Sequence, residues 1–424
     1  MILTLKNIGK IKEAKVEIKG ITVIAGANDT GKRTVGKALF SIFNSFYQIE
    51  KKIKKERLQS IEKVLKLIFR NSRQPSLFDY KYNFKDMAKE FVENIEIYKN
   101  ANDKIKYKIM EYYQNNDFKN KKMIIDDDKL NELIERLNAT LLVSDTDIIK
   151  SDMEKKINAE FNSQVNNIFS NEKGEIKLII QDEAMIVTIS NNLVINIENT
   201  VNLQTEAIYM DDPFIIDEIN EQNNFNRLDD DHRSHLKSKL SNRNIDINLV
   251  DEIVTKNKFS KIYNKLSSVC GGDVVKTKSN VTGYKKAGSD KILDIRNLST
   301  GLKTFVILKK LLTNGVLDYN GTIILDEPEI HLHPEWQLLF AELIVLIQKE
   351  FGMHILLNTH SPYFLDAIDV YSNKYNISDK CKYYLAYNEN EFSYIEDVTN
   401  NLEVIYDKLA KPLQNLENER YSND

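Results

Sequence analysis

The segment from Gly26 to Lys32 has the composition of a loop that binds phosphate. It reads Gly26-Ala27-Asn28-Asp29-Thr30-Gly31-Lys32, which is a Gly-x4-Gly-Lys pattern. A phosphate group needs backbone N–H groups that converge on it, and glycines allow that close approach. A lysine at the end of the loop supplies a positive charge for the terminal phosphates. The sequence therefore predicts a nucleotide-binding site in this loop.

Arg33 stands where this pattern expects a serine or threonine that would hold Mg²⁺. A hydroxyl appears only at Thr34, and a residue one position later on a helix points about 100° away. Thr34 therefore cannot simply substitute. Two interpretations are open: Arg33 contacts phosphate in place of a metal, or it points away from the site. Both put Mg²⁺ binding and rapid hydrolysis in question.

Two carboxylates, Asp326 and Glu327, follow the apolar run Thr322–Leu325. This run predicts a buried strand, and open α/β sheets bind ligands at the C-terminal ends of their strands. We assign Asp326 to the Mg²⁺ shell, through water, and Glu327 to polarising the attacking water as general base. The alternative is an acidic turn that caps a helix, but the phosphate loop calls for an acidic partner of this kind.

Two further segments complete the set. Ser299-Thr300-Gly301 lies just before an expected helix, where it would form a second anion site able to reach the nucleotide of another copy of the chain. An ordinary helix cap is the alternative. His360 ends a strand-like run and suits a contact with the γ-phosphate.

The elements around these residues indicate a mainly parallel α/β core. Ile21–Ala25 is a near-continuous apolar run that enters the loop, as expected for a strand buried on both faces. Residues 31–47 have helical spacing. Two more buried strands are expected at Gly321–Leu325 and His354–Asn358, and helices at Leu302–Leu312 and Glu335–Phe351.

The composition of the chain restricts its class. It has 424 residues, 42% of them hydrophobic and 29% charged, and a net charge of −4, so whole-chain charge gives no argument for nucleic-acid binding. Cys270 and Cys381 have no CxxC spacing, which fits a reducing cytosol. No run of about 18 apolar residues occurs, so we expect a cytoplasmic protein without a membrane span.

The four motifs together resemble the ABC/SMC-type ATPase head in the order of that family. The loop corresponds to Walker A, Ser299–Gly301 to the signature, Asp326 and Glu327 to Walker B, and His360 to the switch histidine. The stretch from Asp326 to Pro334 also looks like that of the OLD- and SMC-like ATPases. The resemblance implies an ATP- and Mg²⁺-binding α/β head with a mixed, mainly parallel sheet and an antiparallel subdomain. Two heads would sandwich ATP, with the signature supplied in trans. No residue is assigned to the family's glutamine loop.

The head is expected to be interrupted by a helical insertion, because the chain becomes rich in Lys, Glu and Asn after the first helix. The expected parts are residues 1–47 with the phosphate loop, 48–170 as the insertion, 171–217 as a strand-rich return, 218–285 as a helical segment, and 286–424 with the other motifs and a C-terminal helix. Within the insertion, Lys51–Arg57 is the most basic patch. A solvated helix face is the preferred interpretation, with a nucleic-acid or partner contact as the alternative.

Three other segments look like the Septu-type antiphage ATPases (PtuA), relatives of which accompany some retrons. They are residues 207–214, 230–236 and 405–414. This resemblance implies a multi-subunit assembly with a separate HNH nuclease and nucleic acid bound through the complex. The alternatives are a non-hydrolysing ATP-binding scaffold of the same complex and an SMC-like DNA repair ATPase that acts alone.

A nuclease within this chain is not expected. The segment after His360 is short and lacks the Asp-x-Asp set of a Toprim domain. The best internal metal candidate is the run from Asp229 to His232 together with His235, because two histidines three residues apart share a helix face. A capped and solvated helix start is the preferred interpretation of that run.

Overall fold

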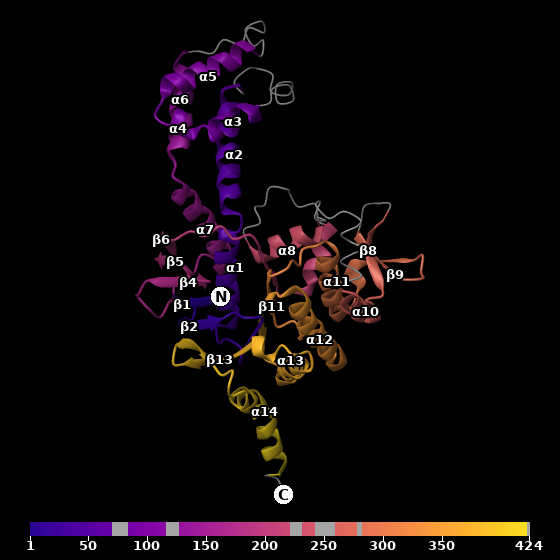
Figure 1. The fold of residues 1–424 in the computed structure, drawn as a ribbon. Helices are drawn as coiled ribbons and strands as arrows, with labels where there is room; N and C mark the ends of the chain where they lie inside the picture. The colour runs from indigo at the N-terminus through magenta and orange to yellow at the C-terminus, as the bar shows by residue number, and fades with distance from the viewer. Residues whose placement is uncertain (70–83, 116–126, 221–230, 242–258, 278–281, 422–424) are drawn as a thin grey trace. The chain divides into compact units, whose positions relative to one another are not determined.

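The computed structural model describes residues 1–69, 84–115, 127–220, 231–241, 259–277 and 282–421 (Figure 1). The chain forms two compact units. One comprises residues 1–47 and 153–424, and the other residues 48–152. The described strands all belong to the first unit, whereas the described elements of the second are helices.

A mixed sheet of eleven strands forms the centre of the first unit, in the order β6-β5-β4-β1-β2-β14-β13-β3-β12-β11-β7. The strands are β1 (Ile2–Ile8), β2 (Ile11–Glu17), β3 (Ile21–Gly26), β4 (Gly174–Ile180), β5 (Glu183–Ser190), β6 (Leu193–Glu198), β7 (Ala207–Met210), β11 (Thr322–Asp326), β12 (His354–Thr359), β13 (Cys381–Glu389) and β14 (Phe392–Asp397).

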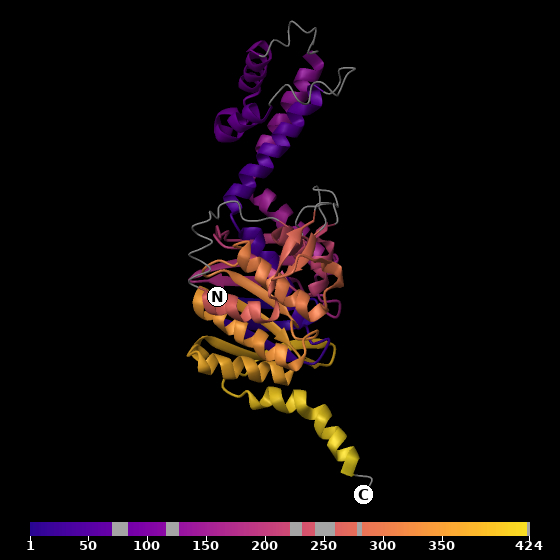
Figure 2. The same ribbon diagram turned by 90° about the vertical axis from the view of Figure 1, so that its right-hand side faces the viewer.

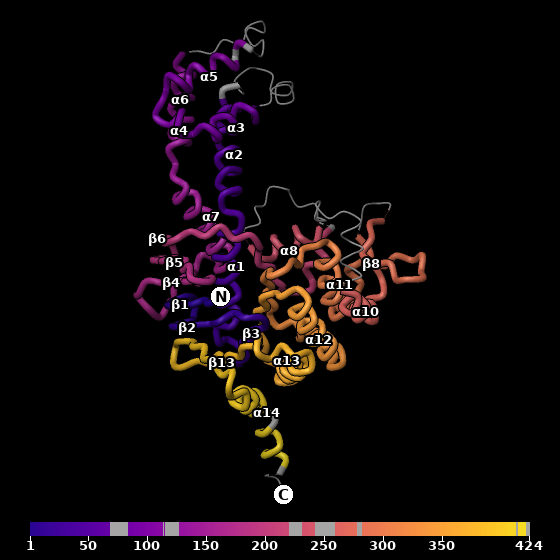
Figure 3. The backbone as a smooth tube through the Cα atoms, viewed as in Figure 1, coloured from indigo at the N-terminus to yellow at the C-terminus, as the bar shows by residue number. Residues whose placement is uncertain are grey.

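The half of the sheet that carries the predicted motifs is parallel. β3, which lies next to β13 in Figure 3, is placed between β13 and β12 and pairs in parallel with both. β12 continues in parallel to β11 and β11 to β7. Every residue of β3 and of β11 is buried, as expected for strands covered on both faces. The C-terminal ends of β3, β11 and β12 therefore meet at one edge of the sheet.

The other half is built mainly from antiparallel pairs. β2, β1, β4, β5 and β6 pair in series with antiparallel registers, and in β5 buried positions alternate with more exposed ones. Such alternation is typical of a sheet with one face in the core. This part is the antiparallel subdomain that the sequence predicted.

Helices cover both faces of the parallel half. On one face lies α1 (Lys32–Phe46), whose helically spaced apolar residues are buried as predicted: Val35, Ala38, Leu39, Ile42, Phe43 and Phe46. On the other face α11 (Thr300–Thr313), α12 (Pro334–Phe351) and α13 (Pro362–Lys374) enclose the larger hydrophobic core (Figure 2, orange). α1 alone starts from the phosphate loop, so this packing fixes the loop over the edge of the sheet.

Local signals in the sequence set the ends of α12 and α13. Pro334 and Pro362 open the two helices, where a missing N–H costs nothing. The Ser361 side chain accepts a hydrogen bond from the Phe364 backbone N–H at 3.2 Å, and Gly352 ends α12 in the left-handed conformation. Both helices therefore begin directly after a motif segment and hold it in place.

The remaining elements of the first unit follow β7 or lie near the C-terminus. They are η2 (Pro213–Asn220), α8 (His232–Ser241), α10 (Ser260–Val269), β8 (Gly272–Lys276), β9 (Thr282–Lys286), β10 (Ile292–Asp294), η3 (Ile295–Asn297), η4 (Ser378–Lys380) and α14 (Glu403–Tyr421). β10, β9 and β8 form a separate antiparallel sheet. The segment 218–285, expected to be helical, thus contains β8 and most of β9 after its helices, because these two strands pair with each other in antiparallel register.

The second unit contains α2 (Ile49–Phe69), α3 (Phe84–Glu93), α4 (Ile95–Tyr98), α5 (Asn102–Asn115), α6 (Asp127–Leu142) and the start of α7 (Asp145–Phe161). Its core is apolar and helically spaced, as at Ile61 and Leu65. Part of the basic patch is used inside this unit: buried Arg57 pairs with Asp145 at 2.7 Å, and Lys54 lies 3.5 Å from Glu93.

The predicted fold class is confirmed. The chain has an α/β head with a mixed sheet and an antiparallel subdomain, and helical elements separate β3 and α1 from the later strands. Among the helices that the structure describes, none has the length and apolar character needed to cross a membrane. Cys270 and Cys381 are both buried and free.

Candidate functional site

The phosphate loop joins β3 to α1 and is held by one contact within the loop and by two contacts from outside it. The Thr30 hydroxyl donates to the Ala27 carbonyl at 2.8 Å, and Lys10 pairs with the Asp29 carboxylate at 2.6 Å. Asn388 of β13 donates to the Asp29 carbonyl at 3.1 Å. Gly31 has φ of 80°, a backbone conformation that glycine adopts without strain. The turn before α1 is thus built into the fold.

Lys32 lies inside the loop. Its ammonium donates to the carbonyls of Gly26 at 3.0 Å and Ala27 at 2.7 Å, and it lies 3.8 Å from Glu327 Oε1. Burial lowers its pKa, although Glu327 and Asp326 oppose that effect. A positive charge is therefore placed where the loop would surround a phosphate.

The structure gives a reason for glycine at position 26 that is separate from the close approach to phosphate expected from the sequence. Gly26 is the last residue of β3, and a Cβ added to it would lie 2.3 Å from the Ala386 carbonyl oxygen of β13. Real Cβ atoms do not approach backbone oxygen this closely. Gly26 is therefore required for the pairing of β3 with β13, whatever its role toward phosphate.

Asp326 and Glu327 lie at the end of β11, as predicted. The Asp326 carboxylate is buried and accepts a hydrogen bond from Asn358 Nδ2 at 2.9 Å. Glu327 has φ of 49°, which is uncommon for a residue other than glycine, and its N–H donates to the Asn358 carbonyl at 3.0 Å. Such backbone conformations persist where surrounding structure enforces them, often at functional sites.

Glu327 and His360 contact each other. His360 Nδ1 lies 3.3 Å from Glu327 Oε1, and the two side chains are 41% and 20% exposed, respectively. Lys32 approaches the same Glu327 oxygen. The sheet edge thus brings a carboxylate, an imidazole and an ammonium together where solvent water can reach them.

Arg33 does not point away from the site, which was one of the two interpretations that the sequence left open. Its Nε pairs with Asp326 Oδ2, so the guanidinium binds the carboxylate that was assigned to the metal shell. Burial opposes the charge on Arg33, but Asp326 outweighs it and raises the pKa of the guanidinium. Thr34 packs at the β1–β2 turn, where a Cβ on Gly9 would lie 3.2 Å from its Oγ1. Thr34 therefore faces away from Asp326.

Sequence reasoning missed several groups that hold this edge together. Asn358 bonds Asp326, and the Thr359 hydroxyl bonds the buried Glu329 carboxyl. Thr359 Oγ1 also accepts from the Ser361 N–H at 3.0 Å, so Glu329 is tied to the segment that carries His360. Burial raises the pKa of Glu329. Asn358, Thr359 and Glu329 each lie within two residues of a predicted site residue, which is the signal that could have found them.

The metal candidate of the sequence lies only partly in the described chain, since residues 229 and 230 fall outside it. His232 and His235 are buried rather than solvated, and each pairs with a carboxylate: His232 with Glu160 at 2.7 Å and His235 with Glu206 at 3.0 Å. Within the described residues, no group of three or more His, Cys, Asp or Glu side chains is arranged to hold a metal. Both histidines therefore contact carboxylates here.

The signature segment is separate from the loop of its own chain. Ser299 is the N-cap of α11, and Thr300 and Gly301 form its first turn. Buried Lys303 in the same helix pairs with Asp217 at 2.6 Å. Among the described residues, no hydrogen bond or ion pair joins Ser299–Gly301 to Lys32, Glu327 or His360. This separation is compatible with a signature that acts on another copy.

The residues present fit ATP and, with one change, Mg²⁺. The loop and Lys32 offer the N–H groups and charge that a triphosphate needs. Mg²⁺ prefers carboxylate and water oxygens, and Asp326 offers a carboxylate at the correct edge. One oxygen of Asp326 is bonded to Arg33 and the other to Asn358, so Arg33 competes with a metal shell for this carboxylate.

Known proteins resemble this chain in sequence. A family model described as AAA ATPase domain matches residues 1–365. The Septu protein PtuA of Bacillus thuringiensis is 43% identical over 53 residues, which are 12% of this chain and 13% of PtuA. The Retron Vc95 probable ATPase of Vibrio cholerae serotype O1 biovar El Tor is 30% identical over 96 residues, 22% of this chain and 18% of that protein. The chain thus matches less than a fifth of either relative, and the resemblance to Septu-type ATPases is confirmed over this length.

Solved structures of SMC heads are similar over most of their length. One is the SMC head bound to the C-winged helix domain of ScpA, with 13% identity, a TM-score of 0.38, and coverage of 95% of this chain and 98% of that one. Another is the SMC head domain from Thermotoga maritima, with 11% identity, a TM-score of 0.37, and coverage of 94% and 98%.

Proposed function

This chain belongs to the AAA ATPase domain family, and we propose that it is an ATP-binding and ATP-hydrolysing subunit of a bacterial antiphage defence complex. The observation that carries the proposal is the meeting of Lys32, Glu327 and His360 at the edge where β3, β11 and β12 end. These groups have the chemistry that phosphoryl transfer to water requires.

In this proposal the loop and Lys32 bind the phosphates of ATP. Glu327 polarises a water molecule and accepts its proton as the water oxygen attacks the γ-phosphorus and ADP leaves. His360, 3.3 Å from Glu327, holds that carboxylate and contacts the γ-phosphate. Mg²⁺, when held near Asp326, neutralises charge on the phosphate oxygens. The signature Ser299–Gly301 acts on the nucleotide of a second copy.

The assembly around the ATPase is also part of the proposal. The resemblance to PtuA supports a cytoplasmic complex in which the nucleotide state of this subunit regulates a partner HNH nuclease. Copies of the chain would associate through their heads, and nucleic acid would be bound through the complex.

Phosphate release from purified protein tests the hydrolysis. Glu327→Gln should lower the rate by about 100-fold or more, because an amide cannot accept the proton of water. Glu403→Gln, at an exposed position at the start of α14, is the matched control and should leave the rate unchanged. Equal rates for the wild type and Glu327→Gln would contradict the proposed enzyme.

A second candidate function is a scaffold that binds ATP without hydrolysing it. The pairing of Arg33 with Asp326 favours it, because that pair occupies a carboxylate that a metal would need. The same assay separates the two functions: the scaffold predicts no phosphate release from the wild type, together with tight ATP binding.

Co-purification tests the partner. Tagged Glu327→Gln protein should retain an HNH nuclease encoded beside its gene in the presence of ATP and retain less without it, since trapped nucleotide favours one state of the assembly. Lys32→Met, which removes the phosphate-binding charge, is the control that ATP should not affect. Retention of no nuclease under either condition would argue against the defence complex and leave the ATPase test unaffected.

A further inference from the structure

A second carboxylate, Asp211, lies beside Asp326 at the edge of the sheet. β7 and β11 are parallel, and Met210 is in register with Leu325, so the chain passes to Asp211 and Asp326 at the same level. Neighbouring strands are about 4.8 Å apart, and residues in register point to the same face. Tyr209 and Ile324, two residues earlier, both face Gly36 of α1. Asp211 therefore leaves β7 on the face that α1 and Arg33 cover.

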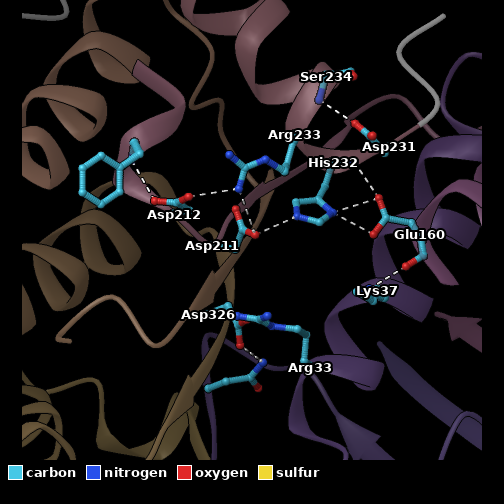
Figure 4. Close-up of polar contacts among 12 residues, drawn as sticks. Arg33, Lys37, Glu160, Asp211, Asp212, Asp231, His232, Arg233, Ser234 and Asp326 are labelled. Atoms are coloured by element: carbon cyan, nitrogen blue, oxygen red, sulfur yellow. Dashed lines mark hydrogen bonds and ion pairs between the residues drawn. The ribbon is translucent and has the colours of Figure 1, made fainter. Parts of the chain in front are cut away.

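Asp211 is held from the side opposite Arg33. His232 Nε2 lies 3.1 Å from its Oδ2, and Arg233 Nη1 lies 3.7 Å from the same oxygen (Figure 4). Burial opposes ionisation of Asp211, but contact with His232 outweighs it and keeps the pKa of Asp211 below its usual value. The other oxygen, Oδ1, is buried and has no hydrogen-bond partner in the described chain. Asp211 is thus a carboxylate that is held in position and has one oxygen that can still accept a hydrogen bond.

His232 is itself fixed, which makes the position of Asp211 firm. Its Nδ1 lies 2.7 Å from Glu160 Oε2, and its ring stacks on Tyr209 with centroids 4.3 Å apart. Its backbone N–H donates to Glu160 Oε1 at 2.5 Å. The imidazole is therefore clamped between two carboxylates, one from α7 and one from the end of β7.

Arg33 lies within the influence of both strand-end carboxylates. It is bonded to Asp326, and the charge of Asp211 also stabilises its protonated form. Its side chain is 58% exposed, so it has room to rotate, whereas Asp326 is buried and further tied by Asn358. The Arg33 guanidinium can therefore change its position more easily than the buried Asp326 carboxylate can.

We propose that Asp211 is the alternative ion-pair partner of Arg33, which moves from Asp326 to Asp211 when Asp326 takes up Mg²⁺ with the nucleotide. The inference rests on the proposed function, because it requires ATP binding at the loop. A guanidinium and a divalent cation compete for the small Asp326 carboxylate, since like charges a few ångströms apart repel. The spare, desolvated oxygen of Asp211 gives the displaced guanidinium a charge-assisted hydrogen bond.

This exchange gives Arg33 a role that the motif pattern does not contain. Without nucleotide, Arg33 pairs with the buried Asp326 carboxylate and neutralises its charge. With nucleotide, Arg33 moves to the carboxylate of Asp211, which His232 already holds in position. The residue after Lys32 is then a cation that vacates the metal position instead of a hydroxyl that fills it.

Fluorescent-ATP binding by the full chain, titrated with Mg²⁺ and repeated in EDTA, tests the exchange. Asp211→Asn should raise the Mg²⁺ concentration for half-maximal tightening about tenfold, a loss of about 1.4 kcal/mol, and leave metal-free affinity unchanged. Arg33→Ala should lower the half-maximal concentration. In the Arg33→Ala background Asp211→Asn should have no further effect, because no guanidinium remains to be received.

Asp212→Asn is the matched control, since Asp212 neighbours Asp211 and pairs with Arg233 at 3.1 Å. It should leave the Mg²⁺ dependence as in the wild type. If Asp211→Asn had the same Mg²⁺ dependence of ATP binding as the wild type, the inference would be overturned. An equal effect of Asp211→Asn in the Arg33→Ala background would also overturn it, because Asp211 would then act on the metal directly or on folding. Failure of the wild type to bind ATP at all is a different result, which would overturn the proposed function and the inference with it.

Discussion

The two sides of the candidate site differ in how closely they follow the motif pattern. On one side Lys32, Glu327 and His360 occupy the positions that the pattern assigns, and Glu327 lies 3.8 Å from Lys32 and 3.3 Å from His360. On the other side Arg33 replaces the expected hydroxyl and pairs with Asp326, and the neighbouring Asp211 pairs with His232, so the pattern contains neither of these contacts.

The difference teaches that the two sides are fixed by different kinds of contact. The matching side depends on residues placed at the ends of adjacent parallel strands, so the strand order alone brings them together. The departing side depends on long side chains that cross between elements, such as His232 of α8 with Glu160 of α7. Variants on each side should therefore fail in different ways.

The largest effect is expected from removing the phosphate-binding charge on the matching side. Lys32→Met should weaken ATP binding by about 1,000-fold, or about 4 kcal/mol, because charge-assisted hydrogen bonds to phosphate are lost. Fluorescent-ATP titration measures this, with Lys63→Met at an exposed position of α2 as control. A loss below about threefold would mean that the loop is not the phosphate site.

The imidazole should affect rate more than binding. His360→Ala should lower the rate of hydrolysis by about 100-fold and change ATP affinity by less than about threefold, because His360 supports Glu327 in the transition state. Single-turnover phosphate release and equilibrium binding separate the two quantities. Equal losses in both would assign His360 to ground-state binding instead.

On the departing side the first effect should be on stability. Contacts with Asp211 and Glu160 overcome the burial of His232 and raise its pKa from 6.5 to about 9. The stabilisation is therefore complete below the unfolded-state pKa and is lost as pH rises through 9. His232→Gln should lower the free energy of unfolding by about 2 kcal/mol near pH 6 and by less near pH 10.

Urea unfolding of both proteins at the two pH values measures that change. The charged and polar groups around the ring are Glu160, Asp211, Arg233 and Tyr209, and only His232 is altered, so the difference between wild type and variant isolates its titration. A difference that does not depend on pH would show that His232 stabilises the fold without its charge.

The smallest effect is expected at Glu329. Its pKa is raised by burial, so replacing the carboxyl with a neutral amide of the same shape in Glu329→Gln should cost less than about 0.5 kcal/mol of stability. Glu329→Ala leaves the Thr359 hydroxyl without this partner and should cost about 2 kcal/mol. Thermal unfolding compares the two, and a larger loss in Glu329→Gln than in Glu329→Ala would mean that Glu329 is needed as a charge.

Most of the parallel core could be predicted from the sequence, because its strands are continuous apolar runs that end in the motif residues. β3, β11 and β12 lie within a residue or two of the expected ranges. The strands β8 and β9 could not be predicted, since Gly272 and Gly283 leave little apolar alternation and the two strands pair within a small separate sheet.

The candidate site divides in the same way. Lys32, Asp326, Glu327 and His360 follow from spacing on neighbouring strands. The orientation of Arg33 does not, because its guanidinium pairs with Asp326, which is 293 residues away in the chain. His232 could not be assigned either, since its partner Glu160 is 72 residues away and nothing local to either residue indicates the contact.

Gly26 has a consequence for how relatives of this protein should be read. The Ala386 carbonyl of the neighbouring strand leaves room at Gly26 for a hydrogen atom but not for a side chain. A homologue that had lost all affinity for nucleotides would still have to keep this glycine in order to build its sheet. In an alignment, retention of Gly26 would thus mark shared architecture, whereas retention of Lys32 would mark shared activity. Inactive members of such a family should be recognised by the loss of the lysine, because the glycine that opens the loop would be kept in active and inactive members alike.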